Sequence, residues 1–228
     1  KNRVASGRYA INKLGCDTLI LDDGFQYLAL KPRIQVLLVD KTNPFGNEHV
    51  LPRGILREPI YNLRRANFVF ITKSDGVGVE PIKDRIKLIN PTAEIIECTH
   101  APRYLVEVGN RKKRTLEWLK GKRITAFSGI AVPYGFEKQL QKLGVNLVGR
   151  FRFVDHHRYT YHEIMYIIEE SMKLNAHAII TTEKDAVRLP PIENSTLRIY
   201  YLRVDIEITK GYADFKSCIN NICRKNLN

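Results

Sequence analysis

Two adjacent carboxylates, Asp22 and Asp23, follow a short apolar run at residues 19–21 and precede Gly24. An apolar run that stops at acidic residues is typical of a buried parallel strand, whose carboxyl end faces the crevice where open α/β sheets bind ligands. Neighbouring carboxylates repel each other, and this cost is tolerated where a divalent cation lies between them and a phosphate. The pair predicts half of a nucleotide site with Asp22 and Asp23 as metal ligands. The alternative is a simple turn, in which Asp-Asp-Gly is also common.

The other half of such a site, a glycine-rich phosphate loop ending in Lys-Ser or Lys-Thr, does not occur in this sequence. The sequence instead starts inside a helical pattern at residues 2–14, which Gly15 ends. Because a βαβ protein normally has a strand before such a helix, we expect a fragment whose N-terminal segment, with the phosphate loop, is missing. Such a fragment should be inactive as a kinase on its own.

A second polar segment, residues 43–59, follows an expected strand at residues 34–39 and ends in Leu-Arg-Glu-Pro. Its position predicts that it lies over the same crevice as Asp22 and Asp23. Arg57 could then steady phosphate charge, and Glu58 could reach the metal or the nucleotide. Equally, Glu58 could form a local salt bridge at a helix start, where the helix dipole favours a carboxylate.

Together these segments resemble the tetraacyldisaccharide 4'-kinase family. The resemblance rests on Asp-Asp-Gly-Phe-Gln at residues 22–26 and Leu-Arg-Glu-Pro at residues 56–59, in the family's order and at about its separation. Shorter matches are Gly-Ile at 129–130, Phe-x-Asp-His at 153–156 and Thr-Thr-Glu-Lys-Asp-Ala at 181–186. The chain departs from the family at Tyr27, usually His, at Glu48, usually Gly, and at Ala131-Val132, usually Gly-Asn.

The resemblance implies ATP-dependent phosphorylation of the 4'-hydroxyl of tetraacyldisaccharide 1-phosphate in lipid A synthesis, with ATP and Mg²⁺ as cofactors. Asp22 and Asp23 would hold Mg²⁺ at the ATP phosphates. His156 would partner an aspartate of the missing segment and take the sugar-hydroxyl proton, or orient the group that does. Lys184 would face the substrate phosphate. Without the resemblance, His156 reads as a surface histidine and the segment after 181 as a helix cap at Thr182.

Composition limits the class of protein and its partners. A chain of 228 residues with 44% hydrophobic content can bury a substantial core. A net charge of +13 attracts nucleic acid, anionic headgroups or phosphorylated substrates without choosing between them. The four cysteines lack CxxC spacing and indicate thiols in a reducing compartment. No apolar run approaches the ~18 residues of a membrane span.

By resemblance, the partners are the lipid A disaccharide precursor and an anionic membrane surface, with no nucleic acid and no protein partner implied. The expected location is peripheral, at the cytoplasmic face of a bacterial inner membrane. The missing N-terminal segment could add an anchor.

Strand-like and helix-like patterns alternate, which predicts an α/β fold with mostly parallel strands. Strands are expected at residues 18–21, 34–39, 68–72, 93–98, 123–127, 145–151, 178–181 and 197–202, with helices at 133–143, 161–174 and 212–223. The resemblance makes residues 1–103 a P-loop NTPase-like sheet domain without its first elements. Residues 104–208 would form a smaller α/β sandwich, and the helix within 209–228 would return to the first domain.

Two runs that alternate apolar and polar residues, 104–108 and 200–208, do not fit a parallel sheet interior. We expect them to pair antiparallel as a two-stranded connector. Such a ribbon could flex and let the domain that carries His156 close on the nucleotide domain.

Three other functions remain to be weighed. Asp155, His156 and His157 resemble the Asp-His-His metal phosphoesterases, but the further acidic and histidine clusters of that class are not found. Thr-Lys-Ser-Asp at 72–75 resembles a guanine-specificity motif, yet the switch motif that should accompany it has the wrong spacing around Gly24. A basic module that binds anionic lipid or nucleic acid would explain the charge but not the blocks at 22–26 and 56–59.

Overall fold

The computed structural model describes residues 2–192 and 195–224. Within it the chain forms two compact units. The first comprises Lys1–His100 and Ile206–Asn228, and the second comprises Ala101–Asp205. The domain boundaries expected from the sequence, after residues 103 and 208, stay a prediction. Compactness alone does not show that a unit folds or moves as an independent domain.

The strands follow the order β1-β2-β3-β8-β7-β5-β6, and β4 pairs with β3. Their bounds are β1 (Val36–Asp40), β2 (Phe68–Thr72), β3 (Glu94–Glu107), β4 (Lys113–Arg114), β5 (Arg123–Ser128), β6 (Asn146–Arg152), β7 (Ala178–Thr182) and β8 (Ile199–Lys210). The β1–β2, β2–β3, β5–β6, β5–β7 and β7–β8 pairs are all parallel. The predicted α/β class with a mainly parallel sheet is confirmed.

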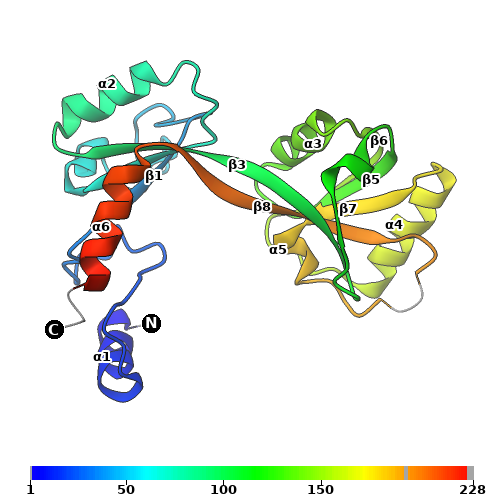
Figure 1. The fold of residues 1–228 in the computed structure, drawn as a ribbon, viewed down its shortest axis with the longest axis horizontal. Helices are drawn as coiled ribbons and strands as arrows, with labels where there is room; N and C mark the ends of the chain where they lie inside the picture. The colour runs from blue at the N-terminus through cyan, green and yellow to red at the C-terminus, as the bar shows by residue number, and fades with distance from the viewer. Residues whose placement is uncertain (1, 193–194, 225–228) are drawn as a thin grey trace. The chain divides into compact units, whose positions relative to one another are not determined.

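Strands β3 and β8 each contribute to both units (Figure 1). At one end of the pair the Val108 N–H donates to the Ile199 carbonyl at 2.9 Å, and at the other the Thr209 hydroxyl donates to the Glu97 carbonyl at 3.2 Å. Residue numbers therefore rise along one strand while they fall along the other, so the two strands are antiparallel, as expected. The sequence prediction was wrong in one respect, because residues 93–98 and 104–108 belong to a single continuous strand.

In the first unit, two helices cover opposite faces of the sheet (Figure 1). Helix α2 (Glu80–Ile89) buries Ile82 and Ile86 in a cluster with Val69 and Ile71 of β2. Helix α6 (Tyr212–Arg224) packs Phe215 edge-on against Phe68 and Phe70 of the same strand, with ring centroids 5.5 and 5.0 Å apart. Alternate side chains of β2 thus enter different layers, which is why residues 68–71 are all apolar.

The strand expected at residues 18–21 is not formed, and this prediction was wrong. Helix α1 (Arg3–Leu14) does form, with Asn2 as N-cap and Gly15 in the left-handed conformation at its end, but it buries no residue. Residues 18–21 are irregular, and Ile20 is 94% exposed. A buried strand needs a hydrogen-bonded neighbour and covered faces. In the part of the chain that the structure describes, β1 is the edge strand and pairs only with β2, so residues 18–21 do not join the sheet.

The second unit is a three-layer sandwich. Helix α3 (Pro133–Lys142) buries Phe136 and Leu140 against one face of the sheet. Helix α4 (Tyr161–Lys173) buries Ile164, Ile167 and Ile168 against the other. Short helices complete the chain: η1 (Ile60–Arg65) in the first unit, and η2 (Leu116–Leu119) and α5 (Glu183–Ala186) in the second. The helices expected at 133–143, 161–174 and 212–223 are confirmed to within one residue.

A buried carboxylate joins α3 to β6. The Arg152 guanidinium donates through Nε and Nη2 to the two oxygens of Glu137, each at 2.7 Å, and Glu137 is buried. The hydrogen bonds from Arg152 hold the pKa of Glu137 below its ordinary value of 4.5. A carboxyl with a lowered folded-state pKa stabilises the fold above its unfolded pKa, and this contribution is lost as the pH falls through the folded value.

We therefore expect Glu137→Gln to lower the free energy of unfolding by about 1–3 kcal/mol at pH 7. The difference in unfolding free energy between variant and parent should begin to narrow below about pH 4.5, the ordinary carboxyl pKa, and should close as the pH falls through the lowered folded-state pKa, where Glu137 becomes neutral. Urea unfolding at several pH values measures it. The control is Glu170→Gln, which removes a surface ion pair between Glu170 and Lys173 within α4. It should lower the free energy of unfolding by no more than about 0.5 kcal/mol. A gap that is constant from pH 7 to pH 3 would contradict the assignment.

Candidate active site

In the first unit, Asp23 and Arg57 form an ion pair that joins the two motif segments. Both oxygens of Asp23 accept hydrogen bonds from Arg57 Nη1, at 2.9 and 2.7 Å, and the same nitrogen donates to Gln26 Oε1 at 3.2 Å. The side chains are 64% and 58% exposed, so the pair stabilises the fold by at most about 1 kcal/mol. Arg57 can consequently exchange Asp23 for another anion at little cost.

Asp22 and Asp23 lie in a turn rather than at a strand end, which corrects that part of the sequence prediction. Asp23 has a φ of +49°, in the left-handed region that Asp tolerates better than most residues. The Arg3 side chain donates to the carbonyls of Asp23 and Asp22, at 3.0 and 3.1 Å. The turn is thus fastened to α1 through its backbone, and the Asp22 carboxylate remains exposed.

Glu58 makes the local ion pair that was the alternative to a catalytic role. Its two oxygens accept from Arg65 Nη2 at 2.7 and 2.8 Å, and Oε2 also accepts from Asn62 at 2.8 Å. Arg65 in turn donates to the Phe25 carbonyl at 3.2 Å and stacks on the Phe25 ring at 4.6 Å. Glu58 therefore forms a second link between the segments, and a catalytic role for it stays a prediction.

Gly54 allows the loop at residues 43–59 to fold on itself. A Cβ at this position would lie 2.1 Å from the His49 carbonyl oxygen and 2.2 Å from Asn47 Oδ1. Asn47 also receives the His49 N–H on Oδ1 and donates to the Arg53 carbonyl at 3.0 Å. Nearby, Glu48 has a φ of +60° and is held by a two-point ion pair to Arg85, at 3.0 and 2.6 Å. This loop therefore depends on close backbone packing that a methyl group would prevent.

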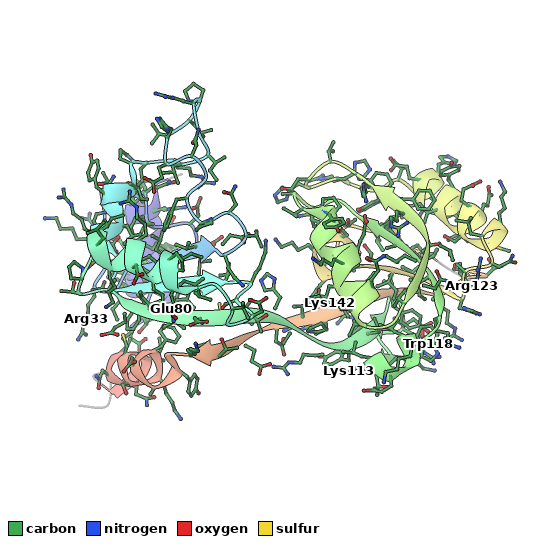
Figure 2. All side chains as sticks on the ribbon, turned by 90° about the horizontal axis from the view of Figure 1, so that it is seen from above. Arg33, Glu80, Lys113, Trp118, Arg123 and Lys142 are labelled. Carbon is green, nitrogen blue, oxygen red and sulfur yellow. The ribbon has the colours of Figure 1, made fainter. Side chains whose placement is uncertain are left out.

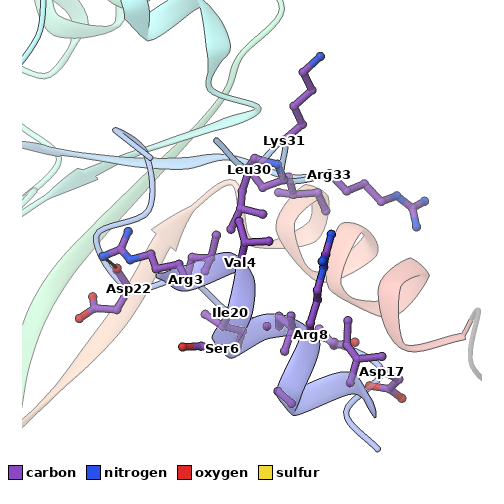
Figure 3. Close-up of a pocket in the computed structure, with 18 of the residues that line it drawn as sticks. Arg3, Val4, Ser6, Arg8, Asp17, Ile20, Asp22, Leu30, Lys31 and Arg33 are labelled. Carbon is purple, nitrogen blue, oxygen red and sulfur yellow. Dashed lines mark hydrogen bonds between the residues drawn. The ribbon is translucent and has the colours of Figure 1, made fainter. Parts of the chain in front are cut away.

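A hollow of about 960 Å³ borders Asp22 (Figure 3). It is lined by α1 and by residues of 17–22 and 30–34. Figure 3 shows the Arg3 and Asp22 side chains side by side, with Val4 and Ile20 nearby on the same lining. The lining combines apolar side chains with the basic residues Arg3, Arg8, Lys31 and Arg33.

Asp22 and Asp23 suit Mg²⁺ as part of a shared coordination sphere. Carboxylate oxygens are the ligands that Mg²⁺ prefers, and it commonly takes one or two of them together with substrate phosphates. Among residues 2–192 and 195–224 no group of three or more His, Cys, Asp or Glu side chains is placed to hold a metal. The two adjacent carboxylates are of the ligand type that Mg²⁺ takes, and their role at a metal stays a prediction.

In the second unit, His156 lies at the carboxyl edge of the parallel strands. Its φ is +64°, and its N–H donates to the Gly129 carbonyl just beyond β5, at 3.1 Å. Gly129 has no room for a side chain, since a Cβ would lie 3.0 Å from Tyr159 Oη and 3.1 Å from His157 Cβ. The ring of His156 is exposed, and Nδ1 lies 2.9 Å from Arg188 Nη2.

Asp185 is fully buried and lies next to Arg188, the residue that contacts His156. Its Oδ2 accepts from the Thr182 hydroxyl at 2.6 Å, and its Oδ1 lies 3.9 Å from Arg188 Nη1. Thr182 caps α5 by accepting the Asp185 N–H, which confirms the capping role expected of it. Burial, and then the charge of Asp185, raise the pKa of Tyr159, so this phenol stays protonated.

The structure thus groups Asp22, Asp23, Arg57 and Glu58 in the first unit, while His156 and Lys184 belong to the second. Lys184 is exposed on α5. Sequence reasoning missed Arg188, whose only signal was its place two residues after the segment at 181–186.

We expect Gly54→Ala to displace the loop at residues 43–59, because the new methyl group must push away the His49 carbonyl. Gly135→Ala in α3 is the control, since its Cβ would meet only a side-chain carbon at 3.8 Å. Gly54→Ala should lower the melting temperature and shift the amide resonances of Asn47 and His49. Gly135→Ala should stabilise by about 0.5–1 kcal/mol, as expected for Gly to Ala within a helix. Equal effects of the two variants would show that the loop is not closely packed.

The chain matches known proteins over most of its length. The family model for tetraacyldisaccharide-1-P 4'-kinase matches residues 1–224. The tetraacyldisaccharide 4'-kinase of Anaeromyxobacter dehalogenans (strain 2CP-C) is 39% identical over 213 residues, which are 92% of this chain and 56% of that protein. The enzyme of that name from Elusimicrobium minutum is 37% identical over 220 residues, 94% of this chain and 58% of its own.

A solved structure shares the fold. It is described as the "apo" form of LpxK from Aquifex aeolicus in complex with ATP, and it superposes with a TM-score of 0.67 at 24% identity. The match covers 96% of this chain and 62% of that one. The present chain spans a little over half the length of the curated relatives it matches. The family model and these relatives confirm the resemblance found in the sequence: the chain belongs to the tetraacyldisaccharide-1-phosphate 4'-kinase family.

Proposed function

We propose that the protein containing this chain transfers the γ-phosphoryl group of ATP to the 4'-hydroxyl of tetraacyldisaccharide 1-phosphate. The observation that carries the proposal is the contact between Asp23 and Arg57, which joins the two family motifs into one polar group. The names of the matched relatives supply the reaction and its substrate. The Aquifex aeolicus structure, which is described as an ATP complex, supports ATP as the donor.

Phosphoryl transfer requires mainly that the reactants are positioned and that negative charge is neutralised. Asp22 and Asp23 would hold Mg²⁺, which when bound supplies charge neutralisation on the phosphates. Arg57 would leave Asp23 and donate its planar fork to a phosphate oxygen, an exchange that the exposure of the pair makes inexpensive. Arg65 keeps Glu58 in place, so Glu58 would act by orienting this segment or, once released, by reaching the metal.

The second unit would supply groups for the acceptor. His156 would assist the sugar hydroxyl or orient the group that takes its proton, and Lys184 would face the substrate phosphate. The left-handed backbone at His156 supports a functional role, because such strain in a non-glycine residue persists mainly where surrounding contacts impose it.

Contacts of His157 disfavour the metal phosphoesterase alternative. Its Nε2 lies 3.1 Å from Glu163, and its ring stacks on Phe153 at 4.7 Å. His156 instead contacts Arg188. The Asp-His-His sequence therefore does not present two histidines to one ion. The basic-module alternative rests on charge alone.

We further propose a peripheral location at an anionic membrane surface, on the cytoplasmic side of a bacterial inner membrane. No helix among residues 2–192 and 195–224 is long and apolar enough to cross a membrane. Basic side chains occur in both units, such as Arg33 in the first and Lys113, Arg123 and Lys142 in the second (Figure 2). Each cation near an anionic membrane contributes about 1 kcal/mol to binding.

The test is a phosphorylation assay on the protein expressed at its natural length, with radiolabelled ATP and tetraacyldisaccharide 1-phosphate. We expect a product that carries the label on the 4' position. The proposed function would be overturned if the natural-length protein failed to make this labelled product while a relative made it in the same assay.

Within this assay, Asp23→Asn should lower kcat by about 100-fold or more, as is typical when a group that stabilises transferring charge is removed. Asp84→Asn, which alters an exposed carboxylate on α2, is the matched control and should stay within about twofold. Circular dichroism checks that both variants fold. Near-normal turnover of Asp23→Asn would rule out its role at the metal while leaving the reaction itself established.

A further inference from the structure

The contact between Arg188 and His156 determines which ring nitrogen of the histidine carries a proton. Arg188 Nη2 lies 2.9 Å from His156 Nδ1. A guanidinium has five N–H donors and no acceptor. Nδ1 must therefore accept this hydrogen bond, and in the neutral ring the single proton lies on Nε2.

A neighbouring carboxylate supports the same tautomer. Asp155 Oδ2 lies 3.8 Å from His156 Nε2. A carboxylate at this distance from Nε2 favours a proton on that nitrogen by its negative charge. Both ring nitrogens thus face groups that favour hydrogen on Nε2.

Arg188 also contacts Asp185, on the side away from His156. Its backbone N–H donates to the Asp185 carbonyl at 2.8 Å, and its Nη1 lies 3.9 Å from the carboxylate of the fully buried Asp185. The Thr182 hydroxyl fixes that carboxylate by donating to Oδ2 at 2.6 Å. The guanidinium therefore lies beside a buried carboxylate at ion-pair distance, while its Nη2 faces His156.

His156 is also fixed at its backbone. Its N–H donates to the Gly129 carbonyl and to Asp155 Oδ1, at 3.1 and 3.0 Å. The left-handed φ of +64° aims the side chain differently from an ordinary extended residue at this position. The ring is thus held by its own backbone on one side and by Arg188 on the other.

We propose that Arg188 is a positioning residue that locks His156 as the Nε2–H tautomer. The series Thr182, Asp185, Arg188 and His156 then delivers an exposed N–H donor at the carboxyl edge of the second unit. The chemical class that this donor recognises is an oxyanion, such as a phosphate or carboxylate oxygen. The tautomer stands on this unit alone, while its use in catalysis rests on the proposed kinase function: His156 would donate to an oxyanion and leave proton removal from the hydroxyl to another group.

The test is long-range proton–nitrogen NMR of the nitrogen-15-labelled chain at about pH 8.5, two units above the ordinary imidazole pKa of about 6.5. The parent should show a bare Nδ1 and a protonated Nε2 at His156. Arg188→Lys keeps a donor and should keep this pattern. Arg188→Glu replaces the donor by an acceptor and should move the proton to Nδ1. Because a free imidazole in water already favours the Nε2–H form, this reversal is the decisive measurement.

His177 provides an internal control, since its Nδ1 accepts the backbone N–H of Arg123 at 2.9 Å and does not involve Arg188. Its signals should be the same in all variants, which also shows that the unit is folded. If Arg188→Glu does not fold, Arg188→Gln replaces it, and a mixture of the two tautomers at His156 is expected. An unchanged His156 pattern in a folded Glu or Gln variant would overturn the proposal.

Kinetics separate this proposal from the proposed function. In the natural-length protein, Arg188→Lys should retain most of kcat, and Arg188→Glu should lower kcat with little change in KM for ATP. A tautomer reversal without any kinase activity in the parent would refute the function and leave the role of Arg188 intact. Kinase activity of the parent, together with an unchanged His156 tautomer in Arg188→Glu, would refute the role of Arg188 and leave the proposed function intact.

Discussion

The antiparallel pairing of β3 with β8 is the interaction on which the sheet depends in both units. In the first unit, β3 carries β2 on its other side, and in the second, β8 carries β7. A buried carboxylate stabilises the pairing in the first unit: Glu97 of β3 forms ion pairs with Lys83 and Lys210, with N···O distances of 2.8 and 3.3 Å, and accepts a hydrogen bond from the Ser74 hydroxyl at 2.8 Å. Burial raises the pKa of Glu97, but the contacts with Lys83, Ser74 and Lys210 outweigh it and lower the pKa overall. The charge therefore persists in the interior and ties α2, the end of β2 and β8 to one strand.

Strands that are buried on both faces were the easiest to predict. The run at residues 68–72 is apolar at its first four positions and ends in Thr72, and it forms β2 with the expected bounds. The run at 18–21 has the same character but no partner strand, so periodicity alone gave the wrong answer. The sequence predicted separate strands at 93–98 and 104–108, whereas β3 continues through Pro102, since a proline removes only one N–H from the ladder.

The site could be predicted to the extent that it lies in contiguous motifs. Asp23 and Arg57 were singled out because their segments resemble one family, and they do contact one another across 34 residues of sequence. Arg188 could not be found in this way. Its contact with His156 depends on a left-handed backbone at the histidine and on the lack of a side chain at Gly129. A local sequence pattern predicts neither this torsion angle nor this close approach.

The two arginines differ in how firmly their carboxylates hold them, and this difference suits different tasks. The Asp23–Arg57 pair is exposed at both ends, so its net contribution is about 0–1 kcal/mol and Arg57 can transfer to a phosphate without a large penalty. Asp185 is fully buried and Arg188 mostly so, and removing one partner of a buried pair typically costs about 3–5 kcal/mol because the other charge is left unpaired. The proposed exchange of Arg57 between Asp23 and a phosphate thus matches a pair at the surface, and the proposed positioning of His156 by Arg188 matches a pair with a buried carboxylate. On these proposals the burial of the carboxylate, rather than the identity of the cation, separates a residue that binds and releases from one that orients.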